Sequence, residues 1–108
     1  MFKLNPAPTF KAAVKVSIPG GEPLPIEFEF KHKTRTGLGE WQKSHVGKSD
    51  KDIVPEFIVG WSGVINETGD QEPWSVDAFQ KLCENYPAAA LEVYAGYVAA
   101  LTESKAKN

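Results

Sequence analysis

The fold is decided by residues 10–30, which read FKAAVKVSIPGGEPLPIEFEF. Apolar and polar side chains alternate along both ends of this stretch, so each end has one apolar face and one polar face. Between them, residues 19–23 read PGGEP and break the alternation with residues typical of a turn. We therefore predict an antiparallel β-hairpin with strands at about 9–18 and 24–32.

The turn also predicts a register for the hairpin. Placing Ile18 opposite Leu24 brings Lys15 opposite Glu27, a favourable pair of opposite charges across the two strands. A hairpin of two strands is only marginally stable in water. We therefore expect helices from the rest of the chain to cover its apolar face.

The remaining sequence has the period of helices. Apolar residues recur at helical spacing, which predicts helices at about 36–46, 50–61, 75–85 and 87–102. Thr36 is the expected cap of the first helix, and Pro55 lies one turn inside the second, which should start late or kink. Ser75 is the clearest N-cap, and Trp74 before it is placed to pack on Phe79. The predicted fold class is α+β, with the N-terminal hairpin packed on a small bundle of about four helices.

Length and composition predict one domain at 1–108, with an extended lead-in at 1–8 and a frayed tail at 103–108. The net charge of −2 creates no field that would attract nucleic acid or an anionic membrane, so we expect neither as a partner. A single cysteine permits no disulfide within the chain. No apolar run approaches the roughly 20 residues of a membrane span, and we expect a cytoplasmic protein.

No group of residues has the pattern of a catalytic or metal site. His32, His45 and Cys83 are spaced too widely for a zinc site, and Cys83 lies on an apolar helix face, where a buried thiol is expected. Gly37 and Gly39 lack the third glycine of a phosphate-binding loop. We therefore predict that the chain is not an enzyme and has no catalytic residue, no metal and no cofactor.

The last predicted helix has unusual faces. The stripe that we expect to face the core consists of Leu91, Tyr94, Val98 and Leu101, widened by Ala90 and Tyr97. The opposite side consists of small residues, namely Ala88, Ala89, Gly96, Ala99 and Ala100. Small residues let another backbone approach closely. Two interpretations stay open: the helix is central to a small bundle, or one side is an exchangeable contact surface for another chain.

Several stretches in order along the chain carry a resemblance to a known family. They read MFKLNPAPTFKAAVKVSIPGGEP, FEFKHKTR, GEW, VGWSGV and AFQKLCENYPAAALEVYAGYVAAL. Together they resemble the tail assembly chaperones of long-tailed bacteriophages and prophages. Gly37 and Gly39 depart from the family pattern, which has better helix formers at that helix start. The resemblance implies a protein without active residues, which works in the host cytoplasm and is absent from the mature virion.

The resemblance also implies partners. Chaperones of this family are understood to coat the tape measure protein, a very long helical protein that sets tail length, and to help recruit tail tube protein. We expect four residues to contact such partners, namely Trp61, Tyr94, Tyr97 and Val98. Self-association is left open. The alternative function is a small structural virion protein, a head–tail joining or tail-completion component, which would remain in purified particles.

Overall fold

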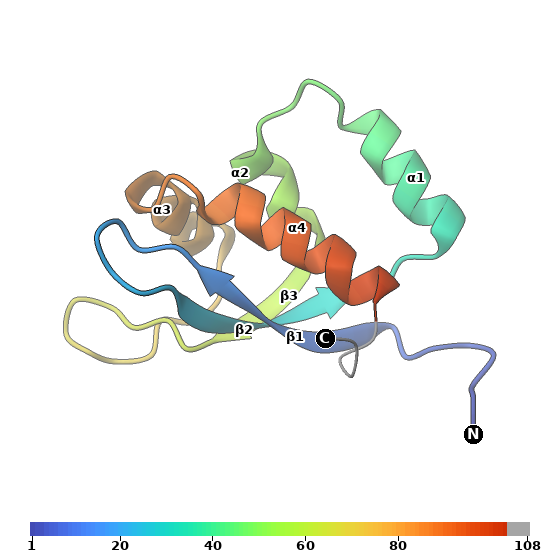
Figure 1. The fold of residues 1–108 in the computed structure, drawn as a ribbon, viewed down its shortest axis with the longest axis horizontal. Helices are drawn as coiled ribbons and strands as arrows, with labels where there is room; N and C mark the ends of the chain where they lie inside the picture. Colours follow the sequence, from blue (N-terminus) through green and yellow to red (C-terminus); the bar gives the residue numbers. More distant parts are fainter. Residues whose placement is uncertain (104–108) are drawn as a thin grey trace.

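The computed structural model describes residues 1–103 and has the predicted α+β architecture (Figure 1). The elements, in chain order, are β1 (Thr9–Val16), β2 (Leu24–Lys31), α1 (Arg35–Ser44), α2 (Asp50–Ile53), the 3₁₀ helix η1 (Val54–Phe57), β3 (Ile58–Ser62), α3 (Val76–Asn85) and α4 (Ala89–Thr102). The predicted frayed tail, apart from Glu103, lies outside the described residues.

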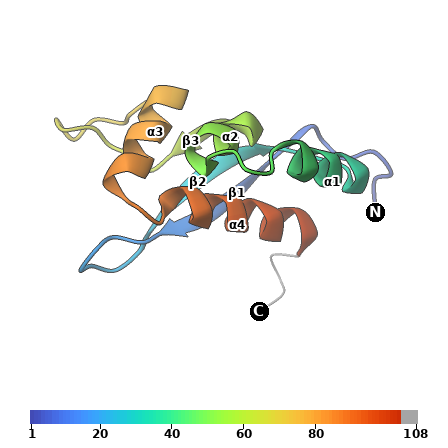
Figure 2. The same cartoon turned by 90° about the horizontal axis from the view of Figure 1, so that it is seen from above.

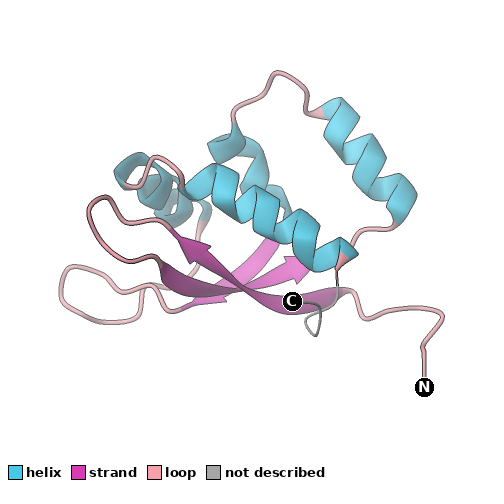
Figure 3. Ribbon diagram, viewed as in Figure 1, coloured by secondary structure: helices cyan, strands magenta, loops and turns pink. Residues whose placement is uncertain are grey.

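The three strands form one antiparallel sheet in the order β1-β2-β3, and the helices lie on one of its faces (Figure 3). The alternation of apolar and polar residues along the hairpin explains why the helices cover one face only, because every second side chain points into the core. The strand residues buried against the helices are Val14, Val16, Ile26, Phe28, Phe30 and Ile58. Viewed from above, α4 runs along the sheet while α1 lies at its margin, away from α3 (Figure 2).

The predicted register of the hairpin is wrong by two residues. Val16, not Ile18, pairs with Leu24, and Lys15 faces Pro25 rather than Glu27. The reason is that Ile18 belongs to the turn, where its carbonyl oxygen accepts a hydrogen bond from the Gly21 N–H at 2.9 Å. Because side chains alternate with a period of two residues, this shift leaves the same residues facing the core.

The predicted helix at 50–61 is wrong in its second half, which is the strand β3. The α-helix ends at Ile53, one 3₁₀ turn carries Pro55, and the chain then extends along the free edge of β2. Phe28 pairs with Trp61 in this ladder. The apolar residues match helical spacing by coincidence. Proline cannot donate the hydrogen bond that would continue the helix, and the β-branched residues after it favour a strand.

The helix starts are set by local hydrogen bonds. Thr34, not the predicted Thr36, caps α1 by accepting a hydrogen bond from the Gly37 N–H at 2.9 Å. Ser75 caps α3 as predicted, and the rings of Trp74 and Phe79 lie 5.7 Å apart. These side chains satisfy N–H groups that a helix start leaves without a backbone partner.

The core centres on Tyr97 of α4. Its ring stacks on Phe57 at 3.9 Å between centroids and lies 5.0 Å from Phe30. Its hydroxyl donates a 2.7 Å hydrogen bond to the carbonyl oxygen of Lys31 at the end of β2. Burial raises the pKa of Tyr97 to about 12, so the group stays a neutral donor at ordinary pH.

The predicted inward face of α4 is also wrong in part. The fully buried residues of this helix are Ala89, Val93 and Tyr97, whereas Leu91 is 61% exposed. A side-chain carbon added at Gly96 would lie only 2.7 Å from Val14 of β1, so the glycine permits the close contact between α4 and the sheet. Small residues therefore face the sheet, which rotates the helix away from the predicted stripe.

Candidate functional site

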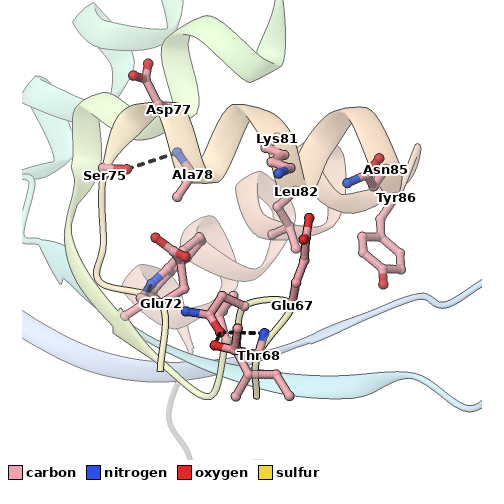
Figure 4. A pocket seen from close by; sticks show the side chains of 14 residues that line it. Glu67, Thr68, Glu72, Ser75, Asp77, Ala78, Lys81, Leu82, Asn85 and Tyr86 are labelled. Carbon is pink, nitrogen blue, oxygen red and sulfur yellow. Dashed lines mark hydrogen bonds between the residues drawn. The ribbon is translucent and has the colours of Figure 1, made fainter. Parts of the chain in front are cut away.

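A groove between α3 and the segment that follows β3 is the larger of two candidate surfaces. We call it the α3 groove; its volume is about 800 Å³ (Figure 4). Its larger apolar lining residues are Trp61, Val64, Ile65, Leu82 and Tyr86. Ile65 is 62% exposed, so apolar surface is open to solvent here. Exposed apolar surface in a concave site is typical of a binding site.

Hydrogen bonds hold the wall of the groove opposite α3. The side-chain oxygen of Asn66 accepts hydrogen bonds from the N–H groups of Thr68 and Asp70, both at 3.0 Å. At the base of this loop, the Trp61 indole N–H donates to the Glu72 carbonyl oxygen at 2.8 Å. The Trp74 ring packs edge-on against Trp61, with centroids 5.0 Å apart. A wall ordered in this way loses little conformational entropy when a partner binds.

The rim of the groove is acidic. Glu67 and Glu72 line it with Lys81, which is two carboxylates against one ammonium group, whereas the Asp77 carboxylate points away from the loop (Figure 4). Figure 4 shows Glu67 extending from the loop toward α3. This rim, around an apolar floor, is complementary to a segment that carries both apolar and basic side chains.

The second candidate surface lies beneath α1 and is formed by Glu56, Phe57 and Tyr94; we call it the α1 surface. Trp41 of α1 covers it, with its ring edge-on to Phe57 at 5.4 Å and stacked beside Tyr94 at 6.1 Å. The Gln42 side-chain amide donates to the Tyr94 hydroxyl at 2.8 Å. A shallow hollow of about 440 Å³ continues this surface along α4, lined in part by Tyr94 and Val98.

A polar cluster closes the margin of the α1 surface. His45 Nδ1 lies 2.6 Å from the Trp41 carbonyl oxygen, and its Nε2 lies 2.8 Å from Glu56 Oε1. The Ser44 hydroxyl also lies 2.8 Å from Nδ1, so three polar groups fix the orientation of the imidazole ring. The Trp41 indole N–H also points to Glu56, at 3.2 Å. Lys33 lies 5.6 Å from the Trp41 ring centre, and burial, followed by repulsion from Lys31, lowers the pKa of Lys33.

Comparison with known proteins identifies the family. The sequence model of the family described as phage tail assembly chaperone matches residues 1–108, the whole chain. The chain belongs to the phage tail assembly chaperone family. This finding confirms the resemblance seen in the sequence. No curated protein and no solved structure gives a significant match.

The described residues of this chaperone show neither a metal site nor a reactive thiol. Residues 1–103 hold no group of three His, Cys, Asp or Glu side chains arranged to bind a metal ion. Burial, with a smaller contribution from Asp50, raises the pKa of Cys83 from 9.0 to about 11, which keeps it a poorly nucleophilic thiol. Within the same residues, no helix has the length and apolar character needed to cross a membrane.

The structure divides the predicted contact residues of the chaperone between three places. Trp61 lines the α3 groove, whereas Tyr94 and Val98 line the hollow beside α1. Tyr97 is completely buried and has no surface to offer a partner. Sequence reasoning missed Ile65, although an apolar pair, Val64 and Ile65, in an otherwise polar loop was a signal for a binding surface.

Proposed function

We propose that this chaperone binds and solubilises the tape measure protein in the host cytoplasm and helps recruit tail tube subunits during tail morphogenesis. Membership of the family supports the general role in tail assembly. The single observation that carries the binding step is the α3 groove, where exposed Ile65 and half-buried Trp61 lie within an acidic rim. Trp61, Tyr94 and Val98 are the proposed contact residues.

The size of the groove fits weak and reversible binding. Burying one large apolar side chain contributes about 1.5–3 kcal/mol. A few such side chains must offset the loss of translational and rotational freedom on association, which is at least about 4 kcal/mol. Individual contacts should therefore be weak. A very long partner with many apolar segments would gain affinity from several chaperones bound side by side, and would still release each of them as the tube assembles.

The binding step can be tested with Ile65→Asp. Ile65 is exposed, so the substitution should leave the fold intact while placing a carboxylate in an acidic, apolar groove. We expect at least about a tenfold loss of tape measure protein recovered by affinity purification after co-expression. Leu24→Asp is the matched control, because Leu24 is 59% exposed and lies in β2, outside the groove. Equal recovery by both variants would contradict the proposal.

Purified virions separate this function from a structural one. A chaperone that leaves during tail assembly should be absent from them, as measured by quantitative mass spectrometry against the tail tube protein. A fixed number of copies in each particle would favour a head–tail joining or tail-completion component instead.

A further inference from the structure

The helix α1 is weakly attached to the rest of the chain. It contributes no buried residue to the core, unlike α2, η1, α3 and α4 among the described helices. It contains Gly37 and Gly39, and each glycine disfavours a helix relative to alanine by up to about fivefold. A helix of ten residues is unstable in water without tertiary contacts. Release of α1 from the surface should therefore also unfold it.

Besides Leu38, which packs partly buried on the core, and the Gln42 bond to Tyr94, two side chains one turn apart attach α1 to Glu56 and Phe57. Trp41 supplies the aromatic anchor against Phe57 and Tyr94, and the His45 ring nitrogen Nε2 meets the Glu56 carboxylate at 2.8 Å. The Glu56 carboxylate also accepts from the Trp41 indole N–H. The α1 surface therefore recognises an aromatic residue followed four positions later, on the same helix face, by a side chain that can donate to a carboxylate.

We propose that α1 is a displaceable occupant of the α1 surface, and that an amphipathic helix of the partner protein takes its place. This rests on the proposed function, in which the partner is a long helical protein. The partner helix presents an aromatic side chain to Phe57 and Tyr94 and, four residues later, a lysine or arginine to Glu56. Charge complementarity selects this occupant, because departure of α1 takes away both hydrogen-bond donors of the Glu56 carboxylate, the Trp41 indole and the His45 ring.

The exchange gives α1 a protective role before the partner arrives. Phe57 is completely buried in the free chain, and Trp41 covers one edge of its ring. Without α1, a patch of aromatic surface would face solvent and favour aggregation. Apparent affinity for the partner equals the intrinsic affinity multiplied by the fraction of chains with α1 released. A weakly held α1 therefore shields the surface and only moderately reduces partner binding.

A peptide copy of α1 tests the inference without the tape measure protein. The probe is a fluorescent peptide of residues 33–48 with Gly39→Ala, titrated into the full chain and followed by anisotropy. In the full chain, Trp41→Ala removes the internal competitor, and we expect the probe to bind at least about tenfold tighter than to the unmodified chain. Gly39→Ala in the full chain strengthens α1 without a clash, and we expect binding about two- to fivefold weaker.

Controls on the probe and the surface sharpen the test. A probe that also carries Trp41→Ala should not bind, and Glu56→Gln in the Trp41→Ala chain should weaken binding of the original probe by about tenfold. If the Trp41→Ala chain does not fold, as judged by circular dichroism, the Gly39→Ala chain decides the question on its own. Binding to that chain as tight as to the unmodified chain would overturn the inference.

Other outcomes are equally decisive. Equal affinity of the probe for the unmodified and Trp41→Ala chains would overturn displacement. Dimers of the Trp41→Ala chain in light scattering would assign the surface to a second copy instead. If the probe fails but tape measure protein still binds in an Ile65-dependent way, the inference falls and the proposed function stands. If binding of the tape measure protein does not depend on Ile65, the proposed function is contradicted, whether or not the probe binds.

Discussion

The helices α1 and α4 lie close together and contribute in opposite ways. α4 buries Ala89, Val93 and Tyr97 completely in the core, whereas α1 has no fully buried residue and packs on the core with the partly buried Leu38 and Trp41. Both helices contain glycine, but Gly96 touches Val14 of the sheet and Gly39 has open space around it. The comparison shows that a glycine in a helix can mark either close packing or weak attachment, and only its surroundings tell which.

The largest expected effect on the free energy of unfolding comes from removing the Tyr97 side chain, through which α4 packs at the centre of the core. Tyr97→Ala should reduce the free energy of unfolding by about 3–5 kcal/mol, because it leaves a cavity among buried aromatic rings. Tyr97→Phe should reduce it by only about 1 kcal/mol, because it removes the hydrogen bond to Lys31 and keeps the ring. Urea unfolding followed by fluorescence measures both. A loss below 1 kcal/mol for Tyr97→Ala, roughly a surface-residue value, would show that α4 is not central.

Gly96→Ala should give the next largest reduction in the free energy of unfolding. The added methyl group would lie 2.7 Å from a methyl carbon of Val14, so α4 must move away from β1. Overpacking costs about 1–3 kcal/mol, and the better helix propensity of alanine returns up to about 1 kcal/mol. We expect a net loss of about 1–2 kcal/mol in the free energy of unfolding, and a gain in stability would show that the contact is loose.

The same substitution at Gly39 should increase stability instead of reducing it. No atom lies within 4 Å of the position of the added carbon, so only helix propensity changes. We expect the local free energy of opening of α1 to rise by up to about 1 kcal/mol, measured by hydrogen exchange of its amides. Faster exchange in this variant than in the unmodified chain would mean that residue 39 needs the freedom of glycine.

Cys83 should show the smallest effect on stability and a clear effect on reactivity. With its pKa raised to about 11 by burial, the thiol should react about a hundredfold more slowly at pH 8 than a free cysteine, by its thiolate fraction. The raised pKa also means that any stabilisation from the neutral thiol is complete below pH 9 and is lost as pH rises toward 11. Cys83→Ala should remove this loss of stability between about pH 9 and pH 11. Labelling of Cys83 by a disulfide reagent at pH 8 as fast as that of a free cysteine would contradict the predicted slow reaction of the thiol.

Local signals were predicted well from the sequence. The alternating residues of the hairpin predicted two strands and their inward faces, and Ser75 with Trp74 predicted the start of α3. These features depend on neighbours within a few residues. The family was also recognisable, because matching stretches extend along the whole chain.

Features that depend on distant contacts were not predictable in the same way. The inward face of α4 is set by the close approach of Gly96 to Val14, which lies 82 positions earlier in the chain (96 − 14). The strand β3 exists because β2 offers a free edge, which helical spacing in its own sequence conceals. The α3 groove combines residues of β3, the following loop and α3, and Trp61 bonds to Glu72 eleven positions later in its wall. The weak attachment of α1 shows only in the low burial of its residues.

Hydrogen exchange, measured by mass spectrometry on the full chain alone and in complex with the tape measure protein, tests the central claim most directly. In the free chain, we expect amides of α1 to exchange at least about a hundredfold faster than those at the centre of α4. In the complex, residues 64–82 should become protected while α1 remains fast, because the partner occupies its surface. An α1 as slow as α4 in the free chain, or one that becomes protected in the complex, would contradict the account.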